Sequence, residues 1–370
     1  MDGYYALSCR MLVVARTWKS SVVNLQVILP SGEKMKGTIA ILLVTCGLLA
    51  VRTESQEAAP LKLAQTYKLS ADVKGNFDHF AIDLAGNRLF ATPEAYKAVL
   101  VFDLKTGNMI HKISGIEKPH AILFRGDLKR LYVTEGEARD VKIIDSDSYK
   151  IVSSVKLLED ADSIGYDTAS KLLYIDNGGG DVHQTYSMLS VVDTTAGKKV
   201  VDIKVDGDTL EAMVLEKSSS RIYLNNKAKS QVDVIDREKR TLIASWPITL
   251  AKTNVAMAYD EANHRLFIAC RSGGIVVLDT QSGKELSVLL ITKGVDDLVF
   301  DAGSKRLYAS CDGDVSVYQQ ASADGYKLLG KVPTGPLART ALLVPQLNRY
   351  FVAVPQNGTT NAEIQVFEVH

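Results

Sequence analysis

A short anchor recurs seven times along the chain, and in most copies it is a basic residue followed by Leu or Ile and then Tyr or Phe. The copies are Arg88-Leu89-Phe90, Arg130-Leu131-Tyr132, Leu172-Leu173-Tyr174, Arg221-Ile222-Tyr223, Arg265-Leu266-Phe267, Arg306-Leu307-Tyr308 and Arg349-Tyr350-Phe351. Successive copies begin 42, 42, 49, 44, 41 and 43 residues apart. A repeat of this regularity constrains the fold more than any local signal, because each copy must form the same structural unit.

Each copy contains four short apolar runs separated by turn residues. The fifth copy reads "NVAMAYD", "RLFIA", "GIVVLD" and "ELSVLLI". A second anchor, an Asp after two apolar residues, ends the third run of five copies: Asp103, Asp145, Asp193, Asp236 and Asp279. Runs of this length and composition predict strands, and helical repeats would need a 3.6-residue period that is absent. The sequence therefore predicts an all-β fold, a seven-bladed β-propeller of four-stranded blades over residues 61–370.

The seventh copy provides only three strands before the chain ends. The segment "AQTYKLS", Ala64–Ser70, resembles the fourth strands of other copies, such as "YKLLGKVPTG". We therefore expect an N-terminal strand to complete the last blade and to cover edges that would otherwise remain open.

The N-terminal region has the composition of an export signal. Met35-Lys36 precedes the apolar run Gly37–Val51, which is too short for a transmembrane helix and has the length of a signal peptide. We expect residues 35–60 to be a signal peptide and linker, residues 1–34 to be an untranslated or disordered extension, and the protein to be periplasmic or secreted. The alternatives are a real extension with an uncleaved anchor, or lipidation at Cys46.

The hairpin motifs resemble those of the YVTN-repeat family of seven-bladed propellers, within the quinoprotein-dehydrogenase-like and WD40-like superfamily. Leu131-Tyr132-Val133-Thr134 nearly spells the motif, and "LYIDN", "IYLNN" and "LFIAC" are looser copies. The resemblance spans Leu61–His370 and implies an exported bacterial protein. It does not imply one activity, because this fold hosts binding proteins, lactonases and quinone-dependent dehydrogenases.

Polar residues stand at the start of every first strand, which lines the central channel of a propeller. They are Asp78, His79, His120, Asp162, Glu211, Asn254, Asp296, Asp297 and Arg339. We predict that they form a ligand-binding ring at the channel mouth, unless they are polar only because such mouths are wet. Two histidines with carboxylates also suit one divalent metal ion as cofactor, with His79, His120, Asp162 and Glu211 as its ligands.

Other features refine the prediction. An insertion, Asp176–Ser187, carries Asp181 and His183 and is expected to overhang the mouth. Cys270 and Cys311 occupy equivalent positions in adjacent copies, which favours two free thiols over a disulfide. The formal net charge is zero, which disfavours nucleic acid as a partner. We expect a monomer, without a membrane span after signal cleavage.

Two functions fit these observations. The first is a non-catalytic, cell-envelope propeller that binds a small molecule or an envelope protein at its channel mouth. The second is a metal-assisted hydrolase of lactonase type, in which Asp78, His79, His120, Asp162 and Glu211 hold an ion and a water nucleophile. No nucleophile–base pair can be named from the sequence, so the binding function is favoured and the ligand stays open.

Overall fold

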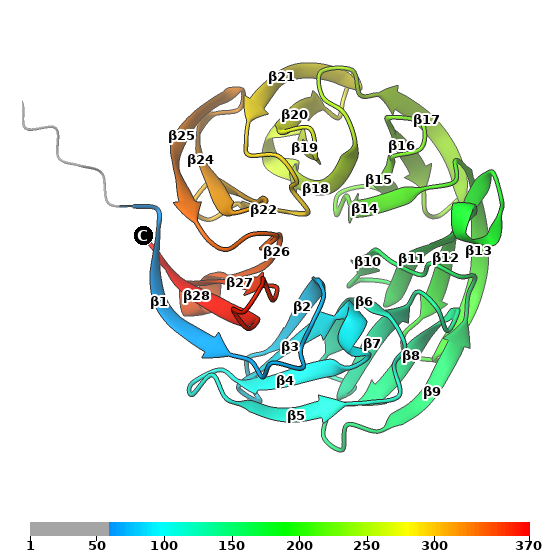
Figure 1. Ribbon diagram of the computed structural model, residues 1–370. Coiled ribbons are helices and arrows are strands. Elements are labelled where there is room, and N and C mark those ends of the chain that lie inside the picture. The colour runs from blue at the N-terminus through cyan, green and yellow to red at the C-terminus, as the bar shows by residue number, and fades with distance from the viewer. Residues whose placement is uncertain (1–58) are drawn as a thin grey trace, which may run out of the picture. The chain divides into compact units, whose positions relative to one another are not determined.

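A computed structural model of the protein describes residues 59–370, which form a closed ring of seven four-stranded antiparallel sheets (Figure 1). The predicted seven-bladed, all-β propeller is confirmed. The predicted extension at 1–34 and the signal peptide within 35–60 lie outside the described residues, apart from the last two positions. Within residues 59–370, no helix has the length and apolar character needed to cross a membrane.

The strands are numbered along the chain, and each blade lists its innermost strand first. Blades 1 to 3 are β2 (Phe77–Asp83), β3 (Arg88–Pro93), β4 (Val99–Asp103), β5 (Met109–Ile113); β6 (Pro119–Arg125), β7 (Arg130–Glu135), β8 (Asp140–Asp145), β9 (Ile151–Lys156); and β10 (Ile164–Asp167), β11 (Leu172–Gly178), β12 (Tyr186–Asp193), β13 (Lys198–Asp206). Blades 4 and 5 are β14 (Leu210–Leu215), β15 (Arg221–Asn226), β16 (Gln231–Asp236), β17 (Thr241–Pro247); and β18 (Asn254–Asp260), β19 (Arg265–Cys270), β20 (Gly274–Asp279), β21 (Lys284–Leu290). Blades 6 and 7 are β22 (Asp297–Asp301), β23 (Arg306–Ser310), β24 (Asp314–Ser322), β25 (Gly325–Pro333); and β26 (Thr340–Val344), β27 (Arg349–Val354), β28 (Glu363–Val369), β1 (Leu61–Lys68). Four short 3₁₀ helices lie in loops: η1 (Glu94–Tyr96), η2 (Gly179–Val182), η3 (Glu261–Asn263) and η4 (Pro345–Leu347).

The Asp anchor forms the turn between the third and fourth strands of a blade. The side chain of Asp193 accepts hydrogen bonds from the backbone N–H groups of Thr195 and Ala196, at 2.8 and 2.9 Å. The turn then needs a residue with positive φ, and Gly197 provides it with φ 63°. Asp side chains readily form such turns, so their regular position marks the turn to the outer strand in five of the seven blades.

The hydrophobic core lies between the blades and consists of seven clusters, one at each interface between neighbouring blades. The aromatic residue of the repeated anchor is buried in every copy, with at most 2% of its surface exposed. Each blade is therefore stabilised mainly by its two neighbours. A ring with one open interface would expose one of the seven clusters.

The ring closes through β1, which pairs antiparallel with the C-terminal strand β28, from Leu61 opposite Val369 to Lys68 opposite Glu363. The predicted closure is confirmed, although the strand begins and ends a few residues earlier than the expected Ala64–Ser70. Tyr67 then joins blade 7 to blade 1: its ring packs against Phe102 and Phe351, and its hydroxyl donates to the Leu104 carbonyl at 2.9 Å.

The two cysteines of the described region are free and fully buried. Burial raises the pKa of each thiol to about 12, so neither is a reactive thiolate at neutral pH. The predicted pair of free thiols is confirmed, and the alternative disulfide is not formed.

Replacing Tyr67 tests the closure. Tyr67→Ala should lower the free energy of unfolding by about 3–5 kcal/mol, because it empties the interface between the last and first blades. Leu63→Ala in the same strand is the matched control. Leu63 is 50% exposed, so its loss should change stability by no more than about 0.5 kcal/mol. Equal urea midpoints for the two variants would contradict the closure.

Candidate functional site

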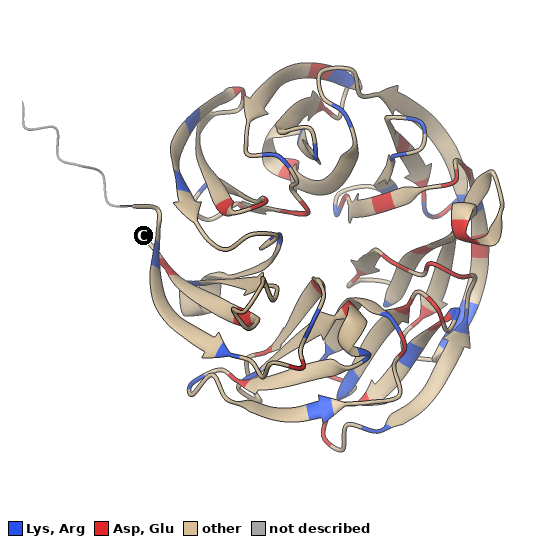
Figure 2. Ribbon diagram, viewed as in Figure 1, with Lys and Arg blue, Asp and Glu red and all other residues tan. Residues whose placement is uncertain are grey.

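A cavity of about 410 Å³ lies where the innermost strands begin, and every blade contributes to its wall. We call it the mouth cavity. Its ionisable lining residues are Asp78, His79, Glu94, His120, Asp162, Glu211, Arg271, Asp296, Asp297 and Arg339. Figure 2 shows acidic and basic segments at the inner ends of several blades as well as on the outer strands. The mouth is therefore lined by groups of both charges.

Irregular pairing at the start of the innermost strands sets which side chains face the cavity. In blade 1 the register shifts between Phe77 and Phe80, so Asp78 and His79 lie within a β-bulge. Similar shifts enclose His120 in blade 2 and Glu211 in blade 4. Bulges redirect side chains relative to a regular strand, and here they turn ionisable groups toward the axis.

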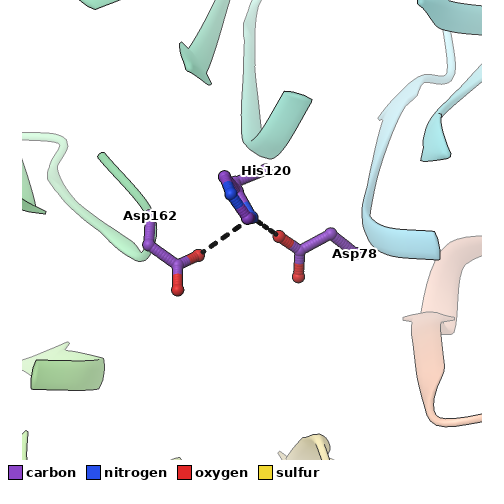
Figure 3. Close-up of side chains that lie close together, drawn as sticks. All are labelled: Asp78, His120 and Asp162. Carbon is purple, nitrogen blue, oxygen red and sulfur yellow. Dashed lines mark hydrogen bonds and ion pairs between the residues drawn. The ribbon is translucent and has the colours of Figure 1, made fainter. Parts of the chain in front are cut away.

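Asp78, His79, His120 and Asp162 form the first half of the site, which we call the carboxylate–histidine cluster. Asp78 uses both oxygens, because Oδ1 lies 3.0 Å from His79 Nδ1 and Oδ2 lies 2.5 Å from His120 Nδ1. Asp162 Oδ1 lies 3.6 Å from the same His120 nitrogen. Figure 3 shows the two carboxylates on either side of the His120 ring. Asp78 thus links two blades through charge-assisted hydrogen bonds.

The protein around the cluster separates the pKa values of its members. Burial disfavours the charged form of Asp78, but the two histidines outweigh burial and hold its pKa well below the usual range. Burial lowers the pKa of an imidazole, yet Asp78 and Asp162 more than offset this and raise the pKa of His120 to about 9. Burial and the charge of Asp78 raise the pKa of Asp162 to about 8. At pH 7 we therefore expect Asp78 to be ionised, His120 to be charged and Asp162 to be mostly neutral.

His79 is the most open member of the cluster. Its side chain is 37% exposed, compared with 8% for His120 and 17% for Asp78. Burial acts against its charge, but Asp78 raises its pKa above the ordinary value. Water in the cavity screens this pairing, so His79 is the histidine best placed to meet a ligand.

The second half of the site consists of Arg271, Asp296, Asp297 and Arg339. Arg271 forms an ion pair with Asp296. Asp297 Oδ2 accepts a hydrogen bond from the backbone N–H of Ala341 at 2.7 Å, and burial raises the pKa of Asp297 to about 7. A terminal nitrogen of Arg339 forms a long ion pair with Asp312 at 3.7 Å, and its buried Nε has no hydrogen-bond acceptor within residues 59–370.

The structure brings eight of the nine predicted ligand-binding residues to the cavity, and Asn254 is the exception. Asn254 is buried and donates to the Asn225 side chain at 2.9 Å and to the Gln231 carbonyl at 3.2 Å. The register of blade 5 shifts between Asn254 and Ala256, and Val255 lines the cavity instead. The prediction for Asn254 was therefore displaced by one residue, because a bulge cannot be read from the sequence.

The other loops contribute differently from the prediction. Asp181 and His183, on the expected overhanging insertion, are not among the cavity-lining residues. Part of this insertion is strand, since β11 extends to Gly178 and β12 begins at Tyr186. Glu94 and Arg271 were missed, and both directly follow the second strand of their blades. The loops after second strands share the mouth face, so that position was the available signal.

Three residues could hold a metal ion: Asp78, His120 and Asp162 offer ligand atoms within 4.8 Å of one another. His79 and Glu211, which the sequence placed in the metal set, lie outside this trio. Glu211 instead pairs with Lys227 at 2.6 Å. Ligands of a tetrahedral ion lie roughly 3.3 Å apart. The 2.5 Å between His120 and Asp78 is therefore the distance of a hydrogen bond and would have to lengthen around an ion.

No protein-family profile matches the chain. Two curated relatives match about a third of its length. "Uncharacterized protein YncE" from Salmonella typhimurium is 31% identical over 120 residues, which is 32% of this chain and 34% of that protein. The protein of the same name from Salmonella typhi is 30% identical over 120 residues, with the same coverage. The chain therefore matches only about a third of the length of these relatives.

Solved structures agree with the fold over most of the chain. A chain of Kuenenia stuttgartiensis hydrazine synthase has a TM-score of 0.65 and 15% identity, covering 80% of this chain and 98% of that one. A chain of a mitotic checkpoint complex has a TM-score of 0.67 and 10% identity, covering 90% of this chain and 99% of that one. At such identities the likeness shows a shared propeller fold and no shared activity.

Proposed function

We propose that this protein is a non-catalytic binding propeller that holds a small molecule in its mouth cavity. The observation that carries the proposal is the cavity itself, about 410 Å³ in volume and walled by ionisable side chains from all seven blades. Sites for small molecules typically measure about 300–1,000 Å³ and use a few well-placed polar groups for specificity. Here the polar groups stand at strand ends, so a rigid ring fixes their positions.

The proposal extends to the family and the location of the protein. The repeated hairpin motifs support membership in the YVTN-repeat propellers. The short apolar run Gly37–Val51 supports export through a signal peptide. The small molecule would then be a solute of the cell envelope.

A ligand screen that compares two histidine variants tests the binding function. We expect at least one compound of a metabolite library to raise the melting temperature of the protein by several degrees. His79→Ala should remove most of that rise, because His79 is the exposed histidine of the mouth. His111→Ala, on the outer strand β5, is the matched control and should keep it. A library without a stabilising compound, or equal responses of the two variants, would contradict binding at the mouth.

The second candidate function is metal-assisted hydrolysis, and the convergence of Asp78, His120 and Asp162 favours it. A divalent cation held there would activate water for attack on an ester or lactone. Glu211 and His79 would then line the substrate side of the cavity rather than hold the ion.

Elemental analysis separates the two functions. Protein purified without chelator and without affinity histidines should contain only traces of zinc, manganese or calcium if the mouth is a plain binding site. Metal-assisted hydrolysis instead predicts one equivalent of metal, lost in His120→Ala, together with turnover of lactones or esters. Arg349→Ala is the control variant. One equivalent of metal that persists in Arg349→Ala but not in His120→Ala would overturn the non-catalytic proposal.

N-terminal sequencing tests export. We expect protein recovered from the periplasm or the medium to begin within residues 52–61, after the apolar run. Recovery from the cytoplasm with Met1 or Met35 as first residue would contradict it.

A further inference from the structure

The charged groups of the mouth cavity differ in how many hydrogen-bond and ion-pair partners they have within the protein. Most of its carboxylates already have a partner within the protein. Asp78 is bonded to two histidines, Glu211 to Lys227, and Asp296 to Arg271. Asp297 accepts a backbone N–H. A cationic ligand would therefore have to compete with existing cations or donors for most of these oxygens.

Arg339 is the opposite case. Its side chain is only 27% exposed, and its Nε is buried without a hydrogen-bond acceptor among residues 59–370. Its nearest carboxylate oxygen, on Asp312, lies at 3.7 Å, which is beyond hydrogen-bond distance. The other oxygen of Asp312 already accepts the Leu337 backbone N–H at 2.7 Å. A guanidinium offers five donors, and a partly buried one without acceptors is costly.

Arg271, which directly follows β19, also has a nitrogen without an acceptor among the described residues. One of its terminal nitrogens pairs with Asp296, but its Nε is also buried and has no acceptor within residues 59–370. Gly294 joins the two arginines, because its N–H donates to the Arg271 carbonyl at 3.0 Å and its Cα faces the Arg339 guanidinium. Both side chains line the mouth cavity.

Gly294 is suited to this arrangement. Its φ is +73°, which other residues adopt only with strain. A Cβ at this position would come within 3.1 Å of the Asp312 Cβ and 3.6 Å of the Arg339 Nε. Glycine is therefore favoured here by its positive φ and by the close approach of the Asp312 side chain, and the Arg339 guanidinium packs beside it.

We infer that Arg271 and Arg339 form the anchor for an anionic ligand, and that the ligand of the mouth cavity is a small carboxylate. This inference rests on the proposed binding function and names the chemistry of its ligand. Guanidinium groups bind the two oxygens of a carboxylate through paired N–H donors, and the buried Nε atoms of Arg339 and Arg271 both lack an acceptor within residues 59–370. His79, the exposed histidine of the mouth, would lie on the same cavity wall as a further donor.

Calorimetric titration of the full chain with matched solutes tests this inference. The probes are acetate, succinate and citrate, the neutral analogue succinamide, the diamine putrescine, and inorganic phosphate as an anion of different shape. At fixed ionic strength at least one carboxylate should bind, and more tightly than its amide, the diamine or phosphate. Tightest binding of phosphate would keep an anion site but overturn the assignment of a carboxylate.

Variants in blade 7 locate the site. Arg339→Gln should weaken carboxylate binding by about 10- to 100-fold, the value of one charge-assisted hydrogen-bonded pair. Arg339→Lys keeps the charge but loses the paired donors, and should lie between Gln and the wild type. Asp312→Asn should tighten binding, because it removes the carboxylate that forms an ion pair with Arg339. Arg349→Gln removes the same charge from the opposite face of the same blade and should bind normally.

The outcomes separate this inference from the binding function. If succinamide or putrescine binds as well as the carboxylates, and His79→Ala abolishes that binding, the mouth is a binding site but the inference is wrong. If carboxylates bind but Arg339→Gln and Arg339→Lys both bind like the wild type, the arginine anchor is wrong. If no compound of the metabolite library stabilises the protein and no calorimetric probe binds to it, both the binding function and the carboxylate inference fail.

Discussion

The pairing of β1 with β28 is the interaction on which the rest of the structure depends. Each blade buries its apolar faces only against its two neighbours, so a ring of seven needs its last interface as much as the other six. The N-terminal strand supplies that interface through Tyr67, and Thr340 adds a hydrogen bond from blade 7 to the Phe77 carbonyl at 2.6 Å. Closure therefore fixes the spacing of the seven inner strands. That spacing in turn determines the shape of the mouth cavity.

Two opposing effects set the pKa values at the mouth: burial disfavours a charged side chain, and an ion-pair partner favours it. Asp78 keeps its charge because two histidines bind it, whereas burial and the charge of Asp78 raise the pKa of Asp162 to about 8. The same cavity holds the guanidinium of Arg339, which has only a long ion pair with Asp312 and whose Nε has no hydrogen-bond acceptor among residues 59–370. This contrast between paired carboxylates and an arginine with an Nε unsatisfied in the described part of the chain supports the proposed ligand site over a merely wet channel. It also favours an anionic ligand over a metal ion at the axis.

Much of this account could be predicted from the sequence, since the repeated anchors have direct physical roles. The Tyr or Phe of each anchor fills an interface between blades, and the Asp of five copies forms the turn to the outer strand. The first-strand positions of the site were also predictable, with the exception of Asn254, where a bulge moves Val255 into the wall. Arg271 was not found, although its position directly after the second strand of blade 5 was an available signal. Which partners a charged side chain such as Arg339 has cannot be read from the sequence, because this depends on three-dimensional packing.

A crystal structure of the full chain grown with citrate, at a resolution that separates individual oxygens, tests the central claim most directly. The account predicts a ring closed by β1 and a carboxylate in the mouth cavity, within hydrogen-bond distance of Arg339 and Arg271. A mouth that holds only water, with Arg339 turned onto Asp312, would contradict the assignment of an anion site. Citrate bound outside the mouth would contradict it as well.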